Sequence, residues 1–141
     1  MQTVRDIMST DVQYCTPLDN MYEVAVKMRE FNVGAIPIVD QGRLVGMITD
    51  RDLVVRGIAE KHPGSTAVTE VMSRELVTVS PDDSVQKAAD IMARHQIRRL
   101  PVVEGGRLVG IVALGDLATN RYSDESAGRA LSEISEQHRV H

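Results

Sequence analysis

The stretch Ile36-Pro-Ile-Val-Asp-Gln-Gly-Arg-Leu-Val-Gly46 returns 64 residues later as Leu100-Pro-Val-Val-Glu-Gly-Gly-Arg-Leu-Val-Gly110. The match extends without a gap over residues 4–53 and 68–117, and 16 of the 50 paired positions are identical. One small unit therefore occurs twice. Every candidate site has a second copy, so positions where the copies differ are as informative as positions where they agree.

Composition indicates a globular protein with an aliphatic core. The chain has 141 residues, of which 43% are hydrophobic and only 3% aromatic, which excludes a disordered protein. Its net charge of −4 gives no electrostatic reason to expect DNA or an anionic membrane as a partner. Cys15 is the single cysteine, so no intrachain disulfide forms. With neither a signal-peptide run nor a membrane-length apolar stretch, we expect a cytoplasmic protein.

Each copy shows the same order of predicted elements. A run of β-forming residues ends at a proline, and a helix with apolar residues at i, i+3, i+4 and i+7 follows. Two further strands flank a tight turn in which Gly42 or Gly106 suits a positive φ, and a second helix closes the copy. The predicted strands are 12–16, 36–39 and 44–49, then 76–80, 100–103 and 108–113, with closing helices at about 51–61 and 116–121.

The apolar stripes of the first helices are Met21, Val24, Ala25 and Met28 in one copy, and Val85, Ala88, Ala89 and Met92 in the other. Asp83 with Gln86 predicts a capping box at the start of the second of these helices. In the first copy Asp19 is the predicted cap, and Tyr22 does not complete the box.

The order β-α-β-β-α and the length of the copy predict an α/β (α+β) fold, with two units packed face to face about a pseudo-twofold axis. One such unit is too small to bury both faces of its sheet alone. We expect repeat 1 at residues 1–60, a polar linker at 61–67, repeat 2 at 68–121 and a tail at 122–141. A short helix at 129–137 is expected to fray or dock weakly.

The tandem unit, its hairpin Pro-h-Val-Asp/Glu-x-Gly-Arg-Leu-Val-Gly and the closing Thr-x-x-Asp resemble the CBS domain pair, or Bateman module. The segment Thr49-Asp-Arg-Asp-Leu-Val-Val-Arg-Gly57 is similar to stand-alone bacterial members, and the resemblance covers residues 1–121. It implies a regulatory module that binds AMP, ADP, ATP or S-adenosylmethionine in clefts between the copies. It also implies a homodimer that changes conformation on binding and acts on an effector protein.

Thr49 and Asp52 are the central candidate residues. The resemblance implies a hydroxyl near phosphate and a carboxylate that accepts hydrogen bonds from both ribose hydroxyls, which a carboxylate can do. The same spacing is also a helix capping box that needs no ligand, and both interpretations stay open. In repeat 2 the residues are Ala113 and Asp116. Because the hydroxyl is lost while the carboxylate is retained, the residue pair slightly favours a ribose-binding role for Asp116 over a capping role.

Arginines are the candidate phosphate contacts, since their planar fork suits phosphate. Arg98 and Arg99 precede the second hairpin, where repeat 1 has Gly34 and Ala35. A solvated, ligand-free role is the alternative. In repeat 1, at most one of two further arginines is expected to face the site, and Arg51 is favoured over Arg56. A charged ligand is predicted to prefer the site with Arg98 and Arg99.

The remaining candidates lie at strand ends. By the resemblance, Thr16 and Ser80 supply a hydroxyl to the sugar-phosphate and nearby backbone groups to the adenine; ordinary turn chemistry is the alternative. Pro37 and Pro101 mark strand edges without a ladder N–H, which leaves backbone free to face a ligand, and Ala35 lies beside the first of them.

Other chemistry is not supported by the sequence. The four histidines are scattered, no grouping predicts a metal site, and the methionines fall at core spacing. Cys15 is expected to be inert. No Walker loop, dinucleotide fingerprint or carboxylate pair is present, so we expect no enzyme and no catalytic cofactor. The alternatives to ligand sensing are a ligand-free dimerisation module and a nucleic-acid-binding variant; the acidic pI of about 5.5 argues against the latter.

Overall fold

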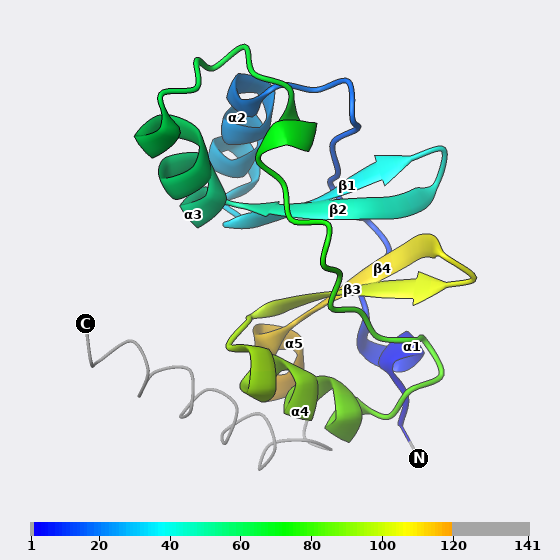
Figure 1. The fold of residues 1–141 in the computed structure, drawn as a ribbon. Helices are drawn as coiled ribbons and strands as arrows, with labels where there is room; N and C mark the ends of the chain where they lie inside the picture. Colours follow the sequence, from blue (N-terminus) through cyan, green and yellow to red (C-terminus); the bar gives the residue numbers. More distant parts are fainter. Residues whose placement is uncertain (1, 120–141) are drawn as a thin grey trace, which may run out of the picture. The chain divides into compact units, whose positions relative to one another are not determined.

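The computed structural model describes residues 2–119, which form two compact units (Figure 1). Residues Gln13–Leu76 with Gly106–Leu108 make up the repeat-1 unit, and the rest makes up the repeat-2 unit. Each unit combines helices with a β-hairpin, which confirms the predicted mixture of α and β structure. The expected tail helix at 129–137 lies outside the described residues.

The first long helix of each copy is present where the apolar periodicity predicts it. Helix α2 spans Met21–Phe31 and helix α4 spans Val85–His95. All four predicted core positions of α4 are buried, whereas Ala25 of α2 is exposed. The buried side chains are Met21, Val24 and Met28 in α2, and Val85, Ala88, Ala89, Met92 and Ala93 in α4.

Both predicted helix caps are wrong by one residue. The N-cap of α2 is Asn20, whose side chain accepts the Glu23 N–H while Glu23 completes a capping box. The N-cap of α4 is Ser84, which accepts the N–H of the third helical residue. Asp19 and Asp83 do not cap because their carboxylates accept N–H bonds from the turn that precedes each helix.

The strands of the two hairpins match the predicted strands, and no strand end differs from its prediction by more than one residue. Strands β1 (Ala35–Asp40) and β2 (Arg43–Thr49) pair antiparallel, and β3 (Arg99–Glu104) neighbours β4 (Arg107–Ala113). The glycines at positions 42 and 106 adopt φ of 85° and 83°, as the tight turns require.

The predicted strands at 12–16 and 76–80 are wrong as strands. Each is reduced to one residue in a parallel bridge, Cys15 to Ile38 and Val79 to Val102. A proline follows each run, and an aspartate then closes a tight turn. Together they bend the chain away from the hairpin after the bridge residue. Ladder pairing therefore stops at once.

The opening segment of each sequence repeat packs in the unit formed mainly by the other repeat. Helix α1 (Val4–Ile7) lies in the repeat-2 unit, where the N–H of its first residue donates to the Asp83 carbonyl at 2.9 Å. The helix η3 (Val68–Glu70), a short 3-10 turn, lies in the repeat-1 unit, where its first N–H donates to the Asp19 carbonyl at 3.0 Å. The two repeats thus exchange their opening segments, and the two contacts are related by the same 64-residue offset as the sequence repeat.

The helices that close the copies differ. In repeat 1, a short α-turn, α3 (Asp50–Asp52), continues as a π-helix, η1 (Leu53–Gly57), and a 3-10 turn, η2 (Ile58–Glu60). In repeat 2 the described part is a regular α-helix, α5 (Leu114–Thr119). A Cβ on Gly57 would lie 2.3 Å from Met21 Cε, so glycine allows η1 to approach α2 closely.

Two glycines of the repeat-2 unit test this packing. A Cβ on Gly110 would lie 2.9 Å from the Ser9 carbonyl oxygen, whereas a Cβ on Gly115, within α5, would meet no other described part of the chain within 4 Å, apart from its own helix and chain neighbours. We expect Gly110→Ala to destabilise the protein by about 1–3 kcal/mol through overpacking. Gly115→Ala is expected to be neutral or stabilising by up to ~1 kcal/mol. Urea unfolding followed by circular dichroism measures both, and equal effects would contradict the close approach at Gly110.

Candidate functional site

Thr49 and Asp52 form a complete capping box at the start of α3. The Thr49 N–H donates to Asp52 Oδ2 at 2.9 Å, and the Asp52 N–H donates to Thr49 Oγ1 at 3.0 Å. The capping interpretation of this motif is therefore confirmed. Both side chains remain partly exposed, so the cap does not exclude a second role in ligand binding.

Repeat 2 keeps the carboxylate half of this cap. The Ala113 N–H donates to Asp116 Oδ2 at 2.9 Å, although residue 113 has no hydroxyl to return the bond. A carboxylate near a helix N-terminus is favourable by about 0.3–1 kcal/mol. Capping alone is therefore sufficient to explain why Asp116 is retained, and a role of Asp116 in ribose binding stays a prediction.

Arg56, rather than Arg51, meets the carboxylate of the motif. Arg56 Nη1 lies 3.9 Å from Asp52 Oδ1, one turn along the helix. The Arg51 N–H instead donates to the side chain of Asp50 at 2.8 Å, and the Arg51 side chain is exposed. The i, i+4 ion pair thus joins Arg56 to Asp52, and the choice of Arg51 as the phosphate contact stays a prediction.

Asp50 is a residue that the sequence analysis missed. Its N–H donates to the Gly34 carbonyl at 3.0 Å, and its carboxylate would lie 3.2 Å from a Cβ at that glycine. The equivalent residue in repeat 2 is Leu114, whose N–H donates to the Arg98 carbonyl at 2.7 Å. The signal was available, because residues 50 and 114 are one of the mismatched pairs in the repeat.

The two repeats therefore place different charges around equivalent backbone. Arg98 is exposed, and Arg99 is half-buried at the start of β3. Beside the closing turn, repeat 1 has two acidic and two basic side chains, whereas the described part of repeat 2 has two arginines and one aspartate. These groups are Asp50, Arg51, Asp52 and Arg56, against Arg98, Arg99 and Asp116.

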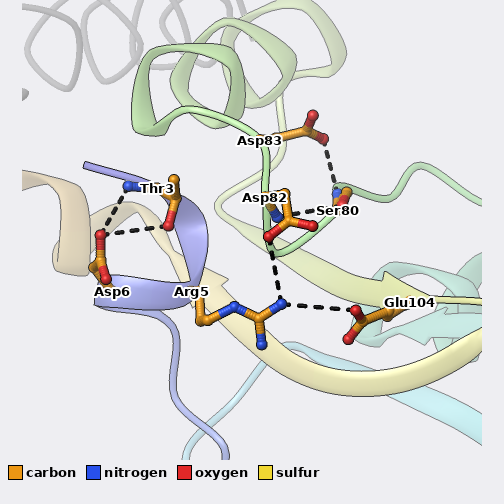
Figure 2. Close-up of polar contacts among 7 residues, drawn as sticks. All are labelled: Thr3, Arg5, Asp6, Ser80, Asp82, Asp83 and Glu104. Carbon is orange, nitrogen blue, oxygen red and sulfur yellow. Dashed lines mark hydrogen bonds and ion pairs between the residues drawn. The ribbon is translucent and has the colours of Figure 1, made fainter. Parts of the chain in front are cut away.

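Thr16 and Ser80 sit in matching turns. The Thr16 N–H donates to Asp19 Oδ2 at 2.7 Å, and the Ser80 N–H donates to Asp83 Oδ2 at 2.8 Å. Each hydroxyl accepts an N–H from two residues on, at 3.3 Å. Figure 2 shows the second of these turns. The turn chemistry expected as the alternative is present at both, and both side chains stay partly exposed.

The edges at Pro37 and Pro101 are not open to a ligand, contrary to the expectation. Both prolines are buried. The Pro37 carbonyl accepts the Cys15 N–H at 3.0 Å, and the Pro101 carbonyl accepts the Val79 N–H at 3.1 Å. The bridge residue that precedes each turn therefore covers the edge.

Within each unit these contacts place the candidates along one hairpin rather than together at one end of it. Ala35 pairs with Thr49 at the ends of β1 and β2, and Cys15, which precedes Thr16, is bonded to residues on either side of Ile38 in β1. The candidates in the repeat-1 unit are Thr16, Ala35, Pro37, Thr49, Arg51 and Asp52; those in the repeat-2 unit are Ser80, Arg98, Arg99, Pro101 and Asp116.

Cys15 is buried beside the Thr16 turn. Burial of the thiol raises the pKa of Cys15 to about 11, which the Lys27 ammonium only partly offsets. Around the same turn, burial opposes ionisation of Asp19, but the Thr16 N–H bond and Lys27 together lower its pKa. The thiol is therefore protonated at neutral pH, and the neighbouring carboxylate is charged.

Within residues 2–119, no three His, Cys, Asp or Glu side chains group as metal ligands. In the same part of the chain, no helix has the length and apolar character needed to cross a membrane.

A family model for the CBS domain matches residues 4–57 and again 68–123. The chain belongs to the CBS domain family. YlbB of Bacillus subtilis is 53% identical over 138 residues, 96% of this chain and 93% of the relative. Hypoxic response protein 1 of Mycobacterium tuberculosis is 40% identical over 120 residues, 84% of each.

Solved structures of CBS proteins share the fold. A crystal structure of Hypoxic Response Protein I with two coordinated zinc ions has a TM-score of 0.77 and covers 84% of this chain and 98% of its own. The CBS domain pair of protein MJ0100, in complex with 5′-methylthioadenosine and S-adenosyl-L-methionine, is 29% identical, with a TM-score of 0.74, and covers 89% of this chain and 98% of its own. Together with the family match, these relatives confirm a CBS pair.

The protonated thiol gives a direct test of burial at the Thr16 turn. A thiolate is the reactive form, and a pKa of about 11 leaves ~0.1% of Cys15 as thiolate at pH 8. We expect a disulfide reagent to label the native protein at least about 100-fold more slowly than the urea-unfolded chain. Similar rates in the two states would contradict the burial.

Proposed function

We propose that this CBS pair is a regulatory module that binds an adenosine-containing ligand, AMP, ADP, ATP or S-adenosylmethionine. The carrying observation is that each repeat places an aspartate, Asp52 or Asp116, on the first turn of the helix that follows the hairpin. The CBS pair of MJ0100 holds two adenosine compounds on the same fold, which supports this ligand class.

The local chemistry suits a nucleoside. Each carboxylate accepts one backbone N–H through Oδ2, and a carboxylate has about four lone-pair positions. A carboxylate can therefore accept hydrogen bonds from ribose hydroxyls in addition to the bond from a backbone N–H. The hydroxyls of Thr16 and Ser80 lie in partly exposed turns, and Oγ of each can donate while it accepts from backbone.

The charges favour repeat 2 for an anionic ligand. Among the described candidate positions of repeat 2, Arg98 and Arg99 stand against one acidic residue, Asp116, whereas Asp50 and Asp52 offset the arginines of repeat 1. Arginine binds phosphate in a bidentate manner. We therefore propose that AMP or ATP prefers the repeat-2 site, and that binding shifts the population of conformers that an effector protein recognises. The role is regulatory, with no catalytic step.

Calorimetric titration with AMP tests the site residues. We expect Asp116→Ala or Arg98→Ala to weaken AMP binding about tenfold or more, since a hydrogen bond to a charged group is worth roughly 1.5–3 kcal/mol. Asp6→Ala is the matched control, because Asp6 also accepts an N–H three residues earlier, from Thr3 at 2.9 Å, and belongs to no candidate site. S-adenosylmethionine is titrated in parallel, with and without EDTA because one solved relative holds zinc. Unchanged binding in both site variants would contradict the proposal.

A ligand-free dimerisation module is the second candidate, favoured by exposed apolar side chains. In the described part of the chain, all eight exposed large hydrophobic residues lie in the repeat-1 unit. Repeat 2 has polar residues at several equivalent positions, such as Gln86 for Tyr22 and Asp82 for Leu18. The eight are Tyr14, Leu18, Tyr22, Phe31, Val54, Val55, Ile58 and Leu76. Exposed large apolar side chains that are concentrated in one unit indicate an interface, and we propose that they support a homodimer.

Sedimentation equilibrium tests the dimer. The double variant Tyr22→Gln/Ile58→Gln removes apolar surface from α2 and η2, where the side chains are 66% and 68% exposed. We expect its dimer dissociation constant to rise at least about tenfold. Arg94→Gln, a polar substitution at an exposed position of α4 in the repeat-2 unit, is the control. A dimer that the double variant leaves intact, or a monomeric parent, would argue against this surface.

A further inference from the structure

The two candidate turns are joined by two segments of the chain. Strap A is residues 4–16: it begins at helix α1 in the repeat-2 unit and ends at Thr16 in the repeat-1 unit. Strap B is residues 68–80: it begins at η3 in the repeat-1 unit and ends at Ser80 in the repeat-2 unit. The straps are equivalent by the 64-residue offset and run between the units in opposite directions along the chain.

Strap A is fastened to the turn that holds Ser80. The N–H groups of Val4 and Arg5 donate to the carbonyls of Asp83 and Pro81, each at 2.9 Å. Arg5 Nη2 also lies 3.4 Å from Asp82 Oδ1 and 3.7 Å from Glu104 Oε1. Figure 2 shows the guanidinium between these two carboxylates, with the Ser80 turn directly beside it.

Strap B is fastened in the same way to the turn that holds Thr16. The Val68 N–H donates to the Asp19 carbonyl at 3.0 Å. Asp19 is also the residue whose carboxylate closes the Thr16 turn. Thus the first residue of each strap is bonded to one candidate turn, and the last residue of the strap belongs to the other candidate turn.

Few residues separate the fastened ends of each strap. Ser9 exchanges two backbone hydrogen bonds with Ile111 in the repeat-2 unit, and Cys15 is already bonded to β1 in the repeat-1 unit. Ser73 and Val79 mark the same points on strap B, through Met47 and Pro101. In the described part of the chain, only residues 10–14 and 74–78 of the straps lie between these points, and none of them makes a backbone–backbone hydrogen bond.

We propose that straps A and B couple the Thr16 turn to the Ser80 turn, so that loosening one turn loosens the other. A short segment held at both ends has few conformations, and a shift at one end has to be taken up at the other. Local openings of linked segments then share their free energy, which appears as coupled hydrogen exchange. The regulatory meaning of the coupling rests on the proposed function, since Thr16 and Ser80 are proposed ligand residues.

Amide hydrogen exchange, followed by NMR on the full chain without ligand, tests the coupling. Asp83→Ala removes the carboxylate that holds the Ser80 N–H. We expect exchange of the Thr16 amide, in the other unit, to speed up at least about fivefold. Asp19→Ala is expected to speed up exchange of the Ser80 amide to the same degree. Asp83→Asn and Asp19→Asn, which keep an acceptor oxygen, are expected to restore slow exchange.

Slack in the straps is the decisive control. A four-residue Gly-Ser insertion between Asp11 and Val12, together with one between Glu75 and Leu76, is expected to abolish the cross-effects, and each single insertion to reduce them. The same insertion between Gly64 and Ser65, which are exposed and lie outside both straps, is expected to leave them intact. Absent cross-effects in the parent chain, or cross-effects that survive both insertions, would overturn the proposal. Because no ligand is used, failure of the adenosine proposal would leave this result standing.

Discussion

An aspartate that accepts a hydrogen bond from the backbone N–H three residues earlier is the interaction on which the structure depends. In the described residues it closes helix α1, both turns before the long helices and both turns after the hairpins. The donors and acceptors are Thr3 and Asp6, Thr16 and Asp19, Thr49 and Asp52, Ser80 and Asp83, and Ala113 and Asp116. These bonds are 2.7–2.9 Å long and charge-assisted. They fix the turns that hold Thr16 and Ser80 and the first turns of α1, α3 and α5, and therefore where the candidate hydroxyls and carboxylates are presented.

The repeat and the hairpins were predictable because they rest on local rules. Apolar periodicity located α2 and α4, and the glycines at 42 and 106 located the turns. The helix caps were not predictable by counting acidic residues. Asp19 and Asn20 both qualify as N-caps by type, and the choice between them depends on the turn at Thr16, which claims the carboxylate of Asp19. The first strands failed for the same reason, since these turns end pairing after one residue.

The candidate site was predictable only as a list of residues. The chemistry of the turns around Thr49 and Thr16 follows from their sequence. The position of Arg56 relative to Asp52 depends on a helical register that includes a π-turn, which no local pattern announces. The cover over the prolines of β1 and β3 comes from a bridge to a residue more than 20 positions away. Long-range backbone pairing of this kind carries no signal in a single sequence.

The exchange of opening segments was hidden by the repeat itself. Because Val4 and Val68 are identical and their surroundings are similar, either segment suits either unit by local sequence, and order along the chain suggests the nearer one. The structure instead bonds each segment to the turn of the opposite repeat, at Asp83 and Asp19. A repeat that used only its own opening segment would form a unit independent of its neighbour. With the segments exchanged, neither unit is complete without chain from the other repeat, so a change in the Thr16 turn is expected to reach the Ser80 turn through the chain itself.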